Sequence, residues 1–198
     1  MCIDYALFTV LNDHAGGNRA AASRFPKIPI YGGDDRVQNV TKLVSRGEVL
    51  HFGPLTVKCL LDPEESSGHV IYVVKNELDK KCEHAFVGDA FSIAGFGNFP
   101  ESHKKHVYKI LTQDIGKLSD NTEIYCGQES AIRNLNIAKT IEPTNPLIQK
   151  KLAWALGQRD KNDPTVPSYF YEEKKYNPFL RLSVPEVQRY FGTNSAQD

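Results

Sequence analysis

The order of strand-like and helix-like stretches predicts a mixed α/β protein, with strands dominating the first part of the chain and helices the last. Apolar, β-branched runs of strand length recur at residues 2–11, 28–33, 48–61, 69–75, 84–89 and 122–127. Apolar residues at helical spacing follow at 102–118 and again from Asn145 onward. Both kinds of element must bury an apolar face, so we expect layers of helices packed on sheets.

Turn-forming residues mark the ends of the first elements. The run 2–11 stops where the polar loop "NDHAGGN" begins. The alanine-rich stretch 18–25 predicts a short helix, which Pro26 ends. Gly53 and Pro54 divide the run that contains them into two strands, which indicates a β-hairpin.

Two stretches of the second half predict helices. The first has apolar residues at helical spacing, namely Val107, Ile110, Leu111 and Leu118. The second starts with Asn145 as N-cap and Pro146 at the first helical position. Its apolar face comprises Ile148, Leu152 and either Ala155 or Leu156.

The segment 163–179 is rich in proline and tyrosine and precedes a short closing helix around Glu186. It can be a free linker or a segment ordered by its own rings. Flexible linkers rarely carry so many aromatic side chains, so we favour the ordered alternative.

Composition excludes several classes of function. The 198 residues suffice for one domain, or one domain with a short appendage, and the 24 basic and 24 acidic side chains cancel. Neither nucleic acid nor an anionic membrane is therefore an expected partner. The apolar runs are far shorter than the roughly 18 to 20 residues that cross a bilayer. The cysteines, at positions 2, 59, 82 and 126, lack metal or disulfide spacing, so we expect reduced thiols and a cytoplasmic location.

The loop after the first strand contains the first candidate ligands. Asp13 and His14 are metal-ligand types, and the glycine pair Gly16-Gly17 would let the backbone approach an ion closely. The alternative is a polar strand-to-helix loop in which the aspartate only caps the helix. The loop by itself leaves both interpretations open.

Several further stretches, taken in order, resemble glyoxalase II, the hydroxyacylglutathione hydrolase of the metallo-β-lactamase fold. The resemblance covers about Asp4 to Gly192 and rests on "DHAGGN", "YGGDDRV", "SSGHVIY", "FVGDAFSIAGFG", "YCGQE", "KLAWA", "PTVPS" and "YNPFLR". It implies an αββα sandwich, here with an incomplete N-terminal sheet, over residues 1–142, and a helical C-terminal region over 143–198. It also implies a family activity, the hydrolysis of S-D-lactoylglutathione to glutathione and D-lactate by a hydroxide held between two metal ions.

The metal ligands that the resemblance implies are largely replaced in this chain. The family pattern T-H-x-H-x-D-H keeps Asp13 and His14, and the aspartate of "GD" is kept as Asp89. Histidines of the family are replaced at Thr9, Leu11, Glu65 and Gln128. His69 corresponds to a family histidine that is not a ligand. We therefore expect no metal, or at most one divalent ion of the zinc type.

The expected glutathione contacts are replaced as well. The family's Lys and Tyr of "G-K-F-Y" correspond to Asn98 and Pro100, and the Tyr after "H-E" corresponds to Ser130. The family's basic C-terminal residues would lie beyond Asp198. A glutathione thioester is therefore the family's substrate but not an expected ligand of this chain.

Strands that precede the metal loop in the family have no counterpart before Met1. The sequence therefore predicts an exposed sheet edge, and with it a fragment, a homodimer through that edge, or an incorrectly delimited gene product. Cys59 and Cys126 lie in apolar strands and are expected to be buried, inert thiols.

Three functions remain open from the sequence. The leading hypothesis is a glyoxalase II-like pseudoenzyme without catalysis. The alternative is a weak thioester hydrolase that uses one metal on Asp13, His14 and Asp89, assisted by Glu65. The third is an inert product with no function.

Overall fold

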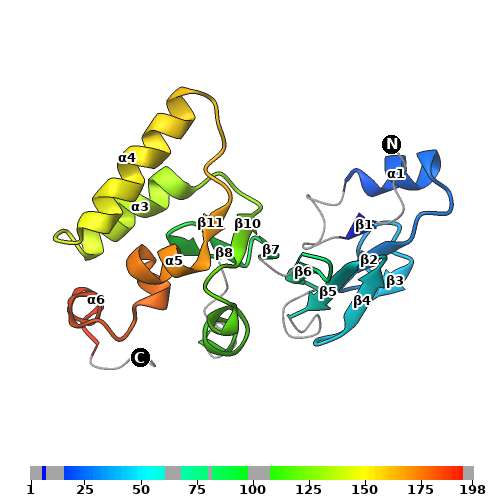
Figure 1. Ribbon diagram of the computed structural model, residues 1–198, viewed down its shortest axis with the longest axis horizontal. Coiled ribbons are helices and arrows are strands. Elements are labelled where there is room, and N and C mark those ends of the chain that lie inside the picture. The colour runs from blue at the N-terminus through cyan, green and yellow to red at the C-terminus, as the bar shows by residue number, and fades with distance from the viewer. Residues whose placement is uncertain (1–5, 8–15, 61–67, 80–81, 98–107, 194–198) are drawn as a thin grey trace. The chain divides into compact units, whose positions relative to one another are not determined.

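The computed structural model describes residues 6–7, 16–60, 68–79, 82–97 and 108–193 (Figure 1). The chain divides into two compact units, Met1–Gly88 and Asp89–Asp198. This division follows the contacts between residues within the chain. The family resemblance implies a boundary between domains at 142/143 instead, and that boundary stays a prediction.

The first unit opens with a short parallel sheet. Its order is β1 (Ala6–Leu7), β2 (Ile30–Gly32), β3 (Lys42–Leu43), and both pairings are parallel. Helix α1 (Asn18–Arg24) lies between β1 and β2 in the sequence, as a parallel pairing requires a crossover. The helix and strand predicted at 18–25 and 28–33 are confirmed.

Four antiparallel strands follow in the same unit. They pair in sequence order as β4 (Val49–Phe52), β5 (Leu55–Cys59), β6 (Tyr72–Asn76) and β7 (Glu83–Gly88). Gly53 has a φ of 58° in the β4–β5 turn, a left-handed conformation that glycine adopts without strain. The hairpin predicted at Gly53-Pro54 is confirmed.

Side chains of both sheets form the core of the first unit. Val57, Cys59 and Tyr72 from the antiparallel strands are buried, and Leu7 and Tyr31 from the parallel sheet pack against this cluster. Burial of Val57 and Cys59 alternates with exposure of the residue between them, the period-two pattern of a half-buried strand. The hydrophobic effect therefore holds the two sheets of this unit together.

The strands of the second unit are short. β8 (Phe91–Ser92) and β9 (Gly95–Phe96) form a small hairpin, and β10 (Glu123–Cys126) pairs antiparallel with β11 (Ser168–Tyr169). The β10–β11 pairing joins the strand predicted at 122–127 to the proline- and tyrosine-rich segment. That segment is therefore ordered, as the sequence predicted.

The stretch predicted as a helix at 102–118 is helical over residues 108–117 but is not a regular α-helix there. A π-helical turn, η3 (Ile110–Asp114), is followed by a 3₁₀ turn, η4 (Ile115–Lys117), and the Ile115 N–H donates to the Ile110 carbonyl five residues back. Ile110 and Ile115 are both fully buried. Residues five apart do not lie on the same face of an α-helix. The wider π-helical turn brings Ile110 and Ile115 to the same buried face.

Two longer helices build the core of the second unit. α3 (Ala131–Ile141) packs against α4 (Pro146–Asp160). At the start of α4, Asn145 Oδ1 accepts a hydrogen bond from the Leu147 N–H at 3.0 Å. The predicted N-cap is therefore confirmed. Of the two alternatives for its apolar face, Ala155 is buried whereas Leu156 is 46% exposed.

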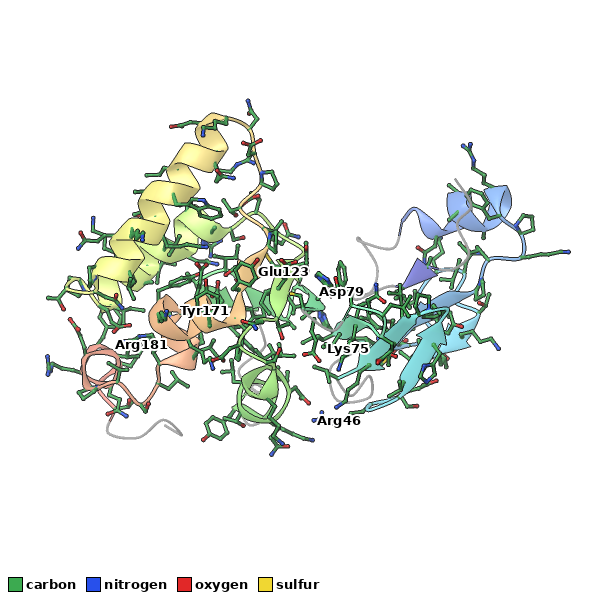
Figure 2. The ribbon with its side chains drawn as sticks, in the orientation of Figure 1. Arg46, Lys75, Asp79, Glu123, Tyr171 and Arg181 are labelled. Carbon is green, nitrogen blue, oxygen red and sulfur yellow. The ribbon has the colours of Figure 1, made fainter. Side chains whose placement is uncertain are left out.

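The chain then closes with α5 (Phe170–Tyr176), η5 (Pro178–Leu180) and α6 (Pro185–Phe191). The last helix confirms the one predicted around Glu186. Arg181 (labelled in Figure 2) forms a bidentate pair with Glu142 at the end of α3, with both N···O distances 2.8 Å. Among the described residues, no helix has both the length and the apolar character needed to cross a membrane.

Candidate functional site

Of the three ligand positions that the family resemblance predicts as retained, the structure describes Asp89. It follows β7 directly and is half-buried. Ala85 and Val87 anchor the strand by full burial, and Gly88 turns the chain with a φ of 52°. The carboxylate therefore stands at the end of a buried strand, the position at which α/β proteins commonly place functional side chains.

Gln128 lies in the connection from β10 to α3, and its side chain is exposed. Its backbone carbonyl accepts a hydrogen bond from Cys126 Sγ at 3.3 Å. The next residue, Glu129, accepts from the Thr165 N–H at 3.1 Å and also from the Thr165 hydroxyl. The motif "YCGQE" is thus fixed to the "PTVPS" segment through its glutamate, while the residue at the ligand position presents a neutral amide to solvent.

Ser130 precedes α3 and is half-buried. Its carbonyl accepts from the Asn134 N–H at 3.0 Å, and its side chain makes no capping hydrogen bond. Asn134 Nδ2 donates to Ser92 Oγ and to the Ile93 carbonyl, each at 3.0 Å. A Cβ on Gly95 would lie 2.5 Å from this Nδ2, so a side chain at this position would displace the Asn134 amide.

The other predicted site residues lie outside the described residues. They are Thr9, Leu11, Asp13, His14, Glu65, Asn98 and Pro100. Asn18, the last residue of the motif "DHAGGN", is described. It is fully buried at the start of α1, and its Nδ2 donates to the Gln38 carbonyl at 2.6 Å. His69 is buried, with its Nε2 3.1 Å from the Val87 carbonyl oxygen, consistent with the structural role expected of it.

The thiols of Cys59 and Cys126 have raised pKa values. Burial raises the pKa of the Cys59 thiol to about 12, with the Glu48 carboxylate adding to this effect. Burial also raises the pKa of Cys126. Reactive cysteines have lowered pKa values, so both raised values favour the prediction of inert thiols. The predicted burial is confirmed for Cys59, whereas Cys126 is half-buried.

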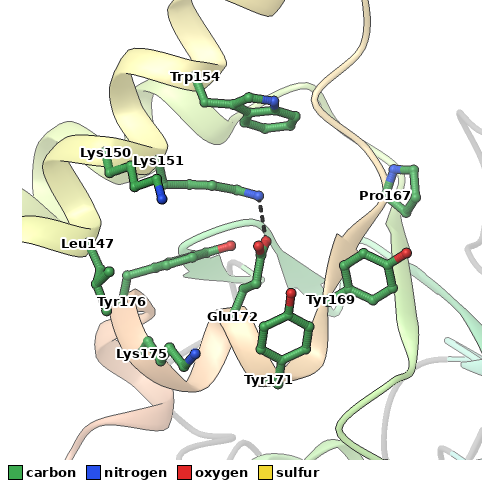
Figure 3. A pocket seen from close by; sticks show the side chains of 10 residues that line it. All are labelled: Leu147, Lys150, Lys151, Trp154, Pro167, Tyr169, Tyr171, Glu172, Lys175 and Tyr176. Atoms are coloured by element: carbon green, nitrogen blue, oxygen red, sulfur yellow. Dashed lines mark hydrogen bonds and ion pairs between the residues drawn. The ribbon is translucent and has the colours of Figure 1, made fainter.

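The sequence-based prediction missed a second group of residues with binding character. A cavity of about 420 Å³ lies between α4 and the β11–α5 segment (Figure 3). We call it the Trp154 pocket; its lining includes Lys150, Trp154, Tyr169, Tyr171 and Lys175. These side chains meet only in the fold. The available signals were the single tryptophan of the chain and the neighbouring tyrosines of the 163–179 segment.

Comparisons of the sequence identify relatives over almost the whole chain. Residues 129–198 match a family model described as hydroxyacylglutathione hydrolase C-terminus. A hydroxyacylglutathione hydrolase-like protein of Gallus gallus is 39% identical over 180 residues, which are 91% of this chain and 64% of the relative. Cytoplasmic hydroxyacylglutathione hydrolase of Arabidopsis thaliana is 39% identical over 188 residues, covering 94% of this chain and 72% of the relative.

The chain therefore spans 64% of the chicken relative and 64% of a similarly named mouse relative, which is less than two thirds of either. Solved structures agree on the fold. ETHE1 from Myxococcus xanthus has a TM-score of 0.59 at 20% identity, covering 89% of this chain and 62% of that one. BLEG-1 B3 metallo-β-lactamase has a TM-score of 0.53 at 17% identity, covering 88% and 75%. The chain has the metallo-β-lactamase fold and belongs to the hydroxyacylglutathione hydrolase family.

Proposed function

We propose that this chain is a glyoxalase II-like pseudoenzyme, which keeps the family fold but does not hydrolyse S-D-lactoylglutathione. The observation that carries the proposal is the replacement of the family's histidine ligands by Thr9, Leu11, Glu65 and Gln128. A catalytic zinc ion normally has three good protein ligands and one open position. A two-metal centre needs such a set twice.

The donor chemistry of this chain does not fit a two-metal centre. Leu11 has no donor atom, and the exposed Gln128 side chain offers a neutral amide in place of an imidazole. Asp89 is half-buried at the end of β7 and would remain from a bridging position. Without a second ion, no retained group supplies the charge that generates the nucleophile and holds the developing oxyanion.

The thiol-recognition positions support the same proposal. Asn98 and Pro100 stand where the family has Lys and Tyr, and the half-buried Ser130 stands where it has a second Tyr. A serine hydroxyl cannot supply the ring contact or the reach of a phenol. We therefore expect glutathione to bind no better than about millimolar. A cytoplasmic location is part of the proposal, because the cysteines lack disulfide spacing.

The second candidate is a weak hydrolase with one metal ion. It is favoured by the joint retention of Asp13, His14 and Asp89, since one imidazole and two carboxylates are a sufficient ligand set for a single divalent ion. The two candidates differ in metal content, which a chemical measurement distinguishes from activity.

The test combines metal analysis with turnover. Protein purified without chelator should carry well under about one metal ion per chain, and added zinc, iron or manganese should give no thioester hydrolysis above background. One variant carries histidine at all four replaced positions, Thr9, Leu11, Glu65 and Gln128. Its matched control carries alanine at the same four positions. We expect the histidine variant alone to take up metal.

Two outcomes would contradict the pseudoenzyme. Turnover within about a hundredfold of an ordinary family member is one of them, because loss of the activating metal should raise the barrier by several kcal/mol. Stoichiometric metal that is lost in both Asp89→Ala and His14→Ala, together with turnover lost in the same variants, would establish the single-metal hydrolase instead.

A further inference from the structure

The Trp154 pocket combines exposed aromatic rings from three elements. Trp154 of α4 is 38% exposed, and Tyr169 of β11 and Tyr171 of α5 are exposed to a similar extent. The two tyrosine rings stack at a centroid distance of 5.6 Å and an interplanar angle of 28°. A cavity of about 420 Å³ is within the range of small-molecule sites, which are typically lined by aromatic side chains with a few polar groups.

An internal ion pair braces the pocket. Lys151 Nζ lies 2.8 Å from a carboxylate oxygen of Glu172, which joins α4 to α5 (Figure 3). The same ammonium lies 4.1 Å from the centroid of the Trp154 ring. The Lys151 side chain is only 12% exposed. Its charge is thus used within the protein, and the indole is held in place before any ligand binds.

Two other lysines leave the pocket electropositive. Three lysines and one glutamate line it, so its net charge is plus two. Within the described part of the chain, neither Lys150 nor Lys175 forms an ion pair with a carboxylate, and Lys175 Nζ lies 4.9 Å from the Tyr171 ring centroid. In Figure 3, Lys150 and Lys175 lie on the side of Leu147, away from Pro167 and Tyr169. Both of these lysines therefore lie toward one side of the pocket, with Tyr169 on the other side.

We propose that the Trp154 pocket binds a planar aromatic anion, that is, a flat ring bearing a phosphate or a carboxylate. The ring would contact the partly exposed side chains of Trp154 and Tyr171, and the anionic group would pair with Lys150 and Lys175. An organic cation would be repelled by the net charge, and a neutral ring would leave both ammonium groups unpaired. None of the residues that line this pocket is an expected metal-ligand position, and the proposal does not depend on the proposed loss of catalysis.

The single tryptophan of the chain provides a direct reporter. In a ¹H–¹⁵N NMR spectrum of the full chain, the indole N–H of Trp154 gives one signal. We would titrate adenosine monophosphate and benzoate, with adenosine and benzamide as their uncharged counterparts and inorganic phosphate alone as an anion without a ring. At least one aromatic anion should shift the indole signal saturably and bind about tenfold more tightly than its uncharged counterpart and than phosphate.

Variants test the two halves of the pocket separately. Lys175→Gln should weaken binding of the aromatic anion by about tenfold and leave binding of the uncharged counterpart unchanged, since the ion pair with the anionic group is lost. Tyr171→Ala should weaken both. Lys161→Gln removes an exposed lysine at the end of α4, outside the pocket, and should change neither affinity. Unchanged thermal unfolding of the three variants would show that each retains the fold.

The outcomes separate the ligand sources. Binding of adenosine monophosphate alone would assign the pocket to phosphorylated rings, and binding of benzoate alone would assign it to aromatic carboxylates. The proposal is wrong if neither shifts the indole signal up to about 5 mM, a concentration that would detect millimolar affinity. It is also wrong if charged and uncharged rings bind equally, or if Lys175→Gln weakens binding no more than Lys161→Gln.

Discussion

Glu173 and Gln128 are two polar residues of the second unit with opposite surroundings. The Glu173 carboxylate is fully buried and accepts hydrogen bonds from the Ala94 N–H at 2.9 Å and from Asn177 Nδ2 at 3.0 Å. It also accepts from Ser168 Oγ at 2.5 Å and from the Tyr176 hydroxyl at 2.8 Å. Gln128 is exposed, and its side chain makes no hydrogen bond within the described part of the chain.

The comparison shows that the side chain of Glu173 supports the fold, whereas the side chain of Gln128, an expected ligand position, does not contribute hydrogen bonds to it within the described residues. A buried carboxylate with several donors cannot be replaced without leaving those donors unpaired. An exposed ligand position contributes to the fold only through its backbone. Substitutions at ligand positions can therefore remove metal chemistry while the family fold persists, which is the pattern the proposed pseudoenzyme requires.

The largest effect is expected from Glu173→Ala. This change removes the acceptor of hydrogen bonds that connect α5 to the β8–β9 turn and to β11, and it leaves a cavity. Loss of about 3 to 5 kcal/mol in the free energy of unfolding is expected, because the donors remain buried and unpaired. Urea denaturation measures this loss.

Glu173→Gln is the matched control. The amide keeps the shape and one acceptor oxygen, and the hydroxyls of Ser168 and Tyr176 can reverse their direction to accept from the new NH₂ group. We expect a loss of about 1 kcal/mol. Equal losses in the alanine and glutamine variants would contradict the role of Glu173 as a hydrogen-bond acceptor for several partners.

A smaller effect should appear as a pH dependence. Burial raises the pKa of Glu173 above its ordinary value of 4.5, although its hydrogen bonds oppose the shift. The folded state therefore binds this proton more tightly than the unfolded state does. The contribution to the free energy of unfolding is fully present below pH 4.5 and is lost as the pH rises through the folded-state pKa.

The measurement is the difference between wild type and Glu173→Gln in urea unfolding from pH 4.5 to pH 8. The wild type should lose stability relative to the variant as the pH rises. Tyr176 and Cys126, which face Glu173, have pKa values raised above their ordinary ones and do not titrate in this range. A constant difference across the range would exclude a raised pKa at Glu173.

Local signals in the sequence were sufficient for much of the fold. Asn145 and Pro146 marked the start of α4, and Gly53 marked the β4–β5 turn, because capping and left-handed turns depend on the residue itself. The π-helical turn at Ile110–Asp114 was not predictable in this way. It depends on burial of both Ile110 and Ile115, which is set by the rest of the second unit.

The candidate sites were predictable to different degrees. The expected ligand replacements, including Gln128, are predictions from motif positions and stay predictions. The Trp154 pocket could not be predicted in this way, because the ion pair that joins α4 to α5, Lys151 with Glu172, connects residues 21 positions apart. Pairs of this kind are determined by the packing of α4 on α5, and helical periodicity within either segment does not reveal them.

The smallest effect is expected from Gln128→Ala, with Glu129→Ala as its neighbour for comparison. Gln128 has an exposed side chain without hydrogen bonds within the described residues, so its removal should change the free energy of unfolding by less than about 0.5 kcal/mol. Glu129 accepts from the Thr165 N–H and lies 3.9 Å from Arg159 Nη1, so its removal should cost about 1 to 2 kcal/mol. Thermal or urea unfolding of both variants without added metal measures the contrast between adjacent residues. If Gln128→Ala cost as much as Glu129→Ala, the ligand position would support the fold, and its replacement could no longer be explained as a loss of chemistry alone.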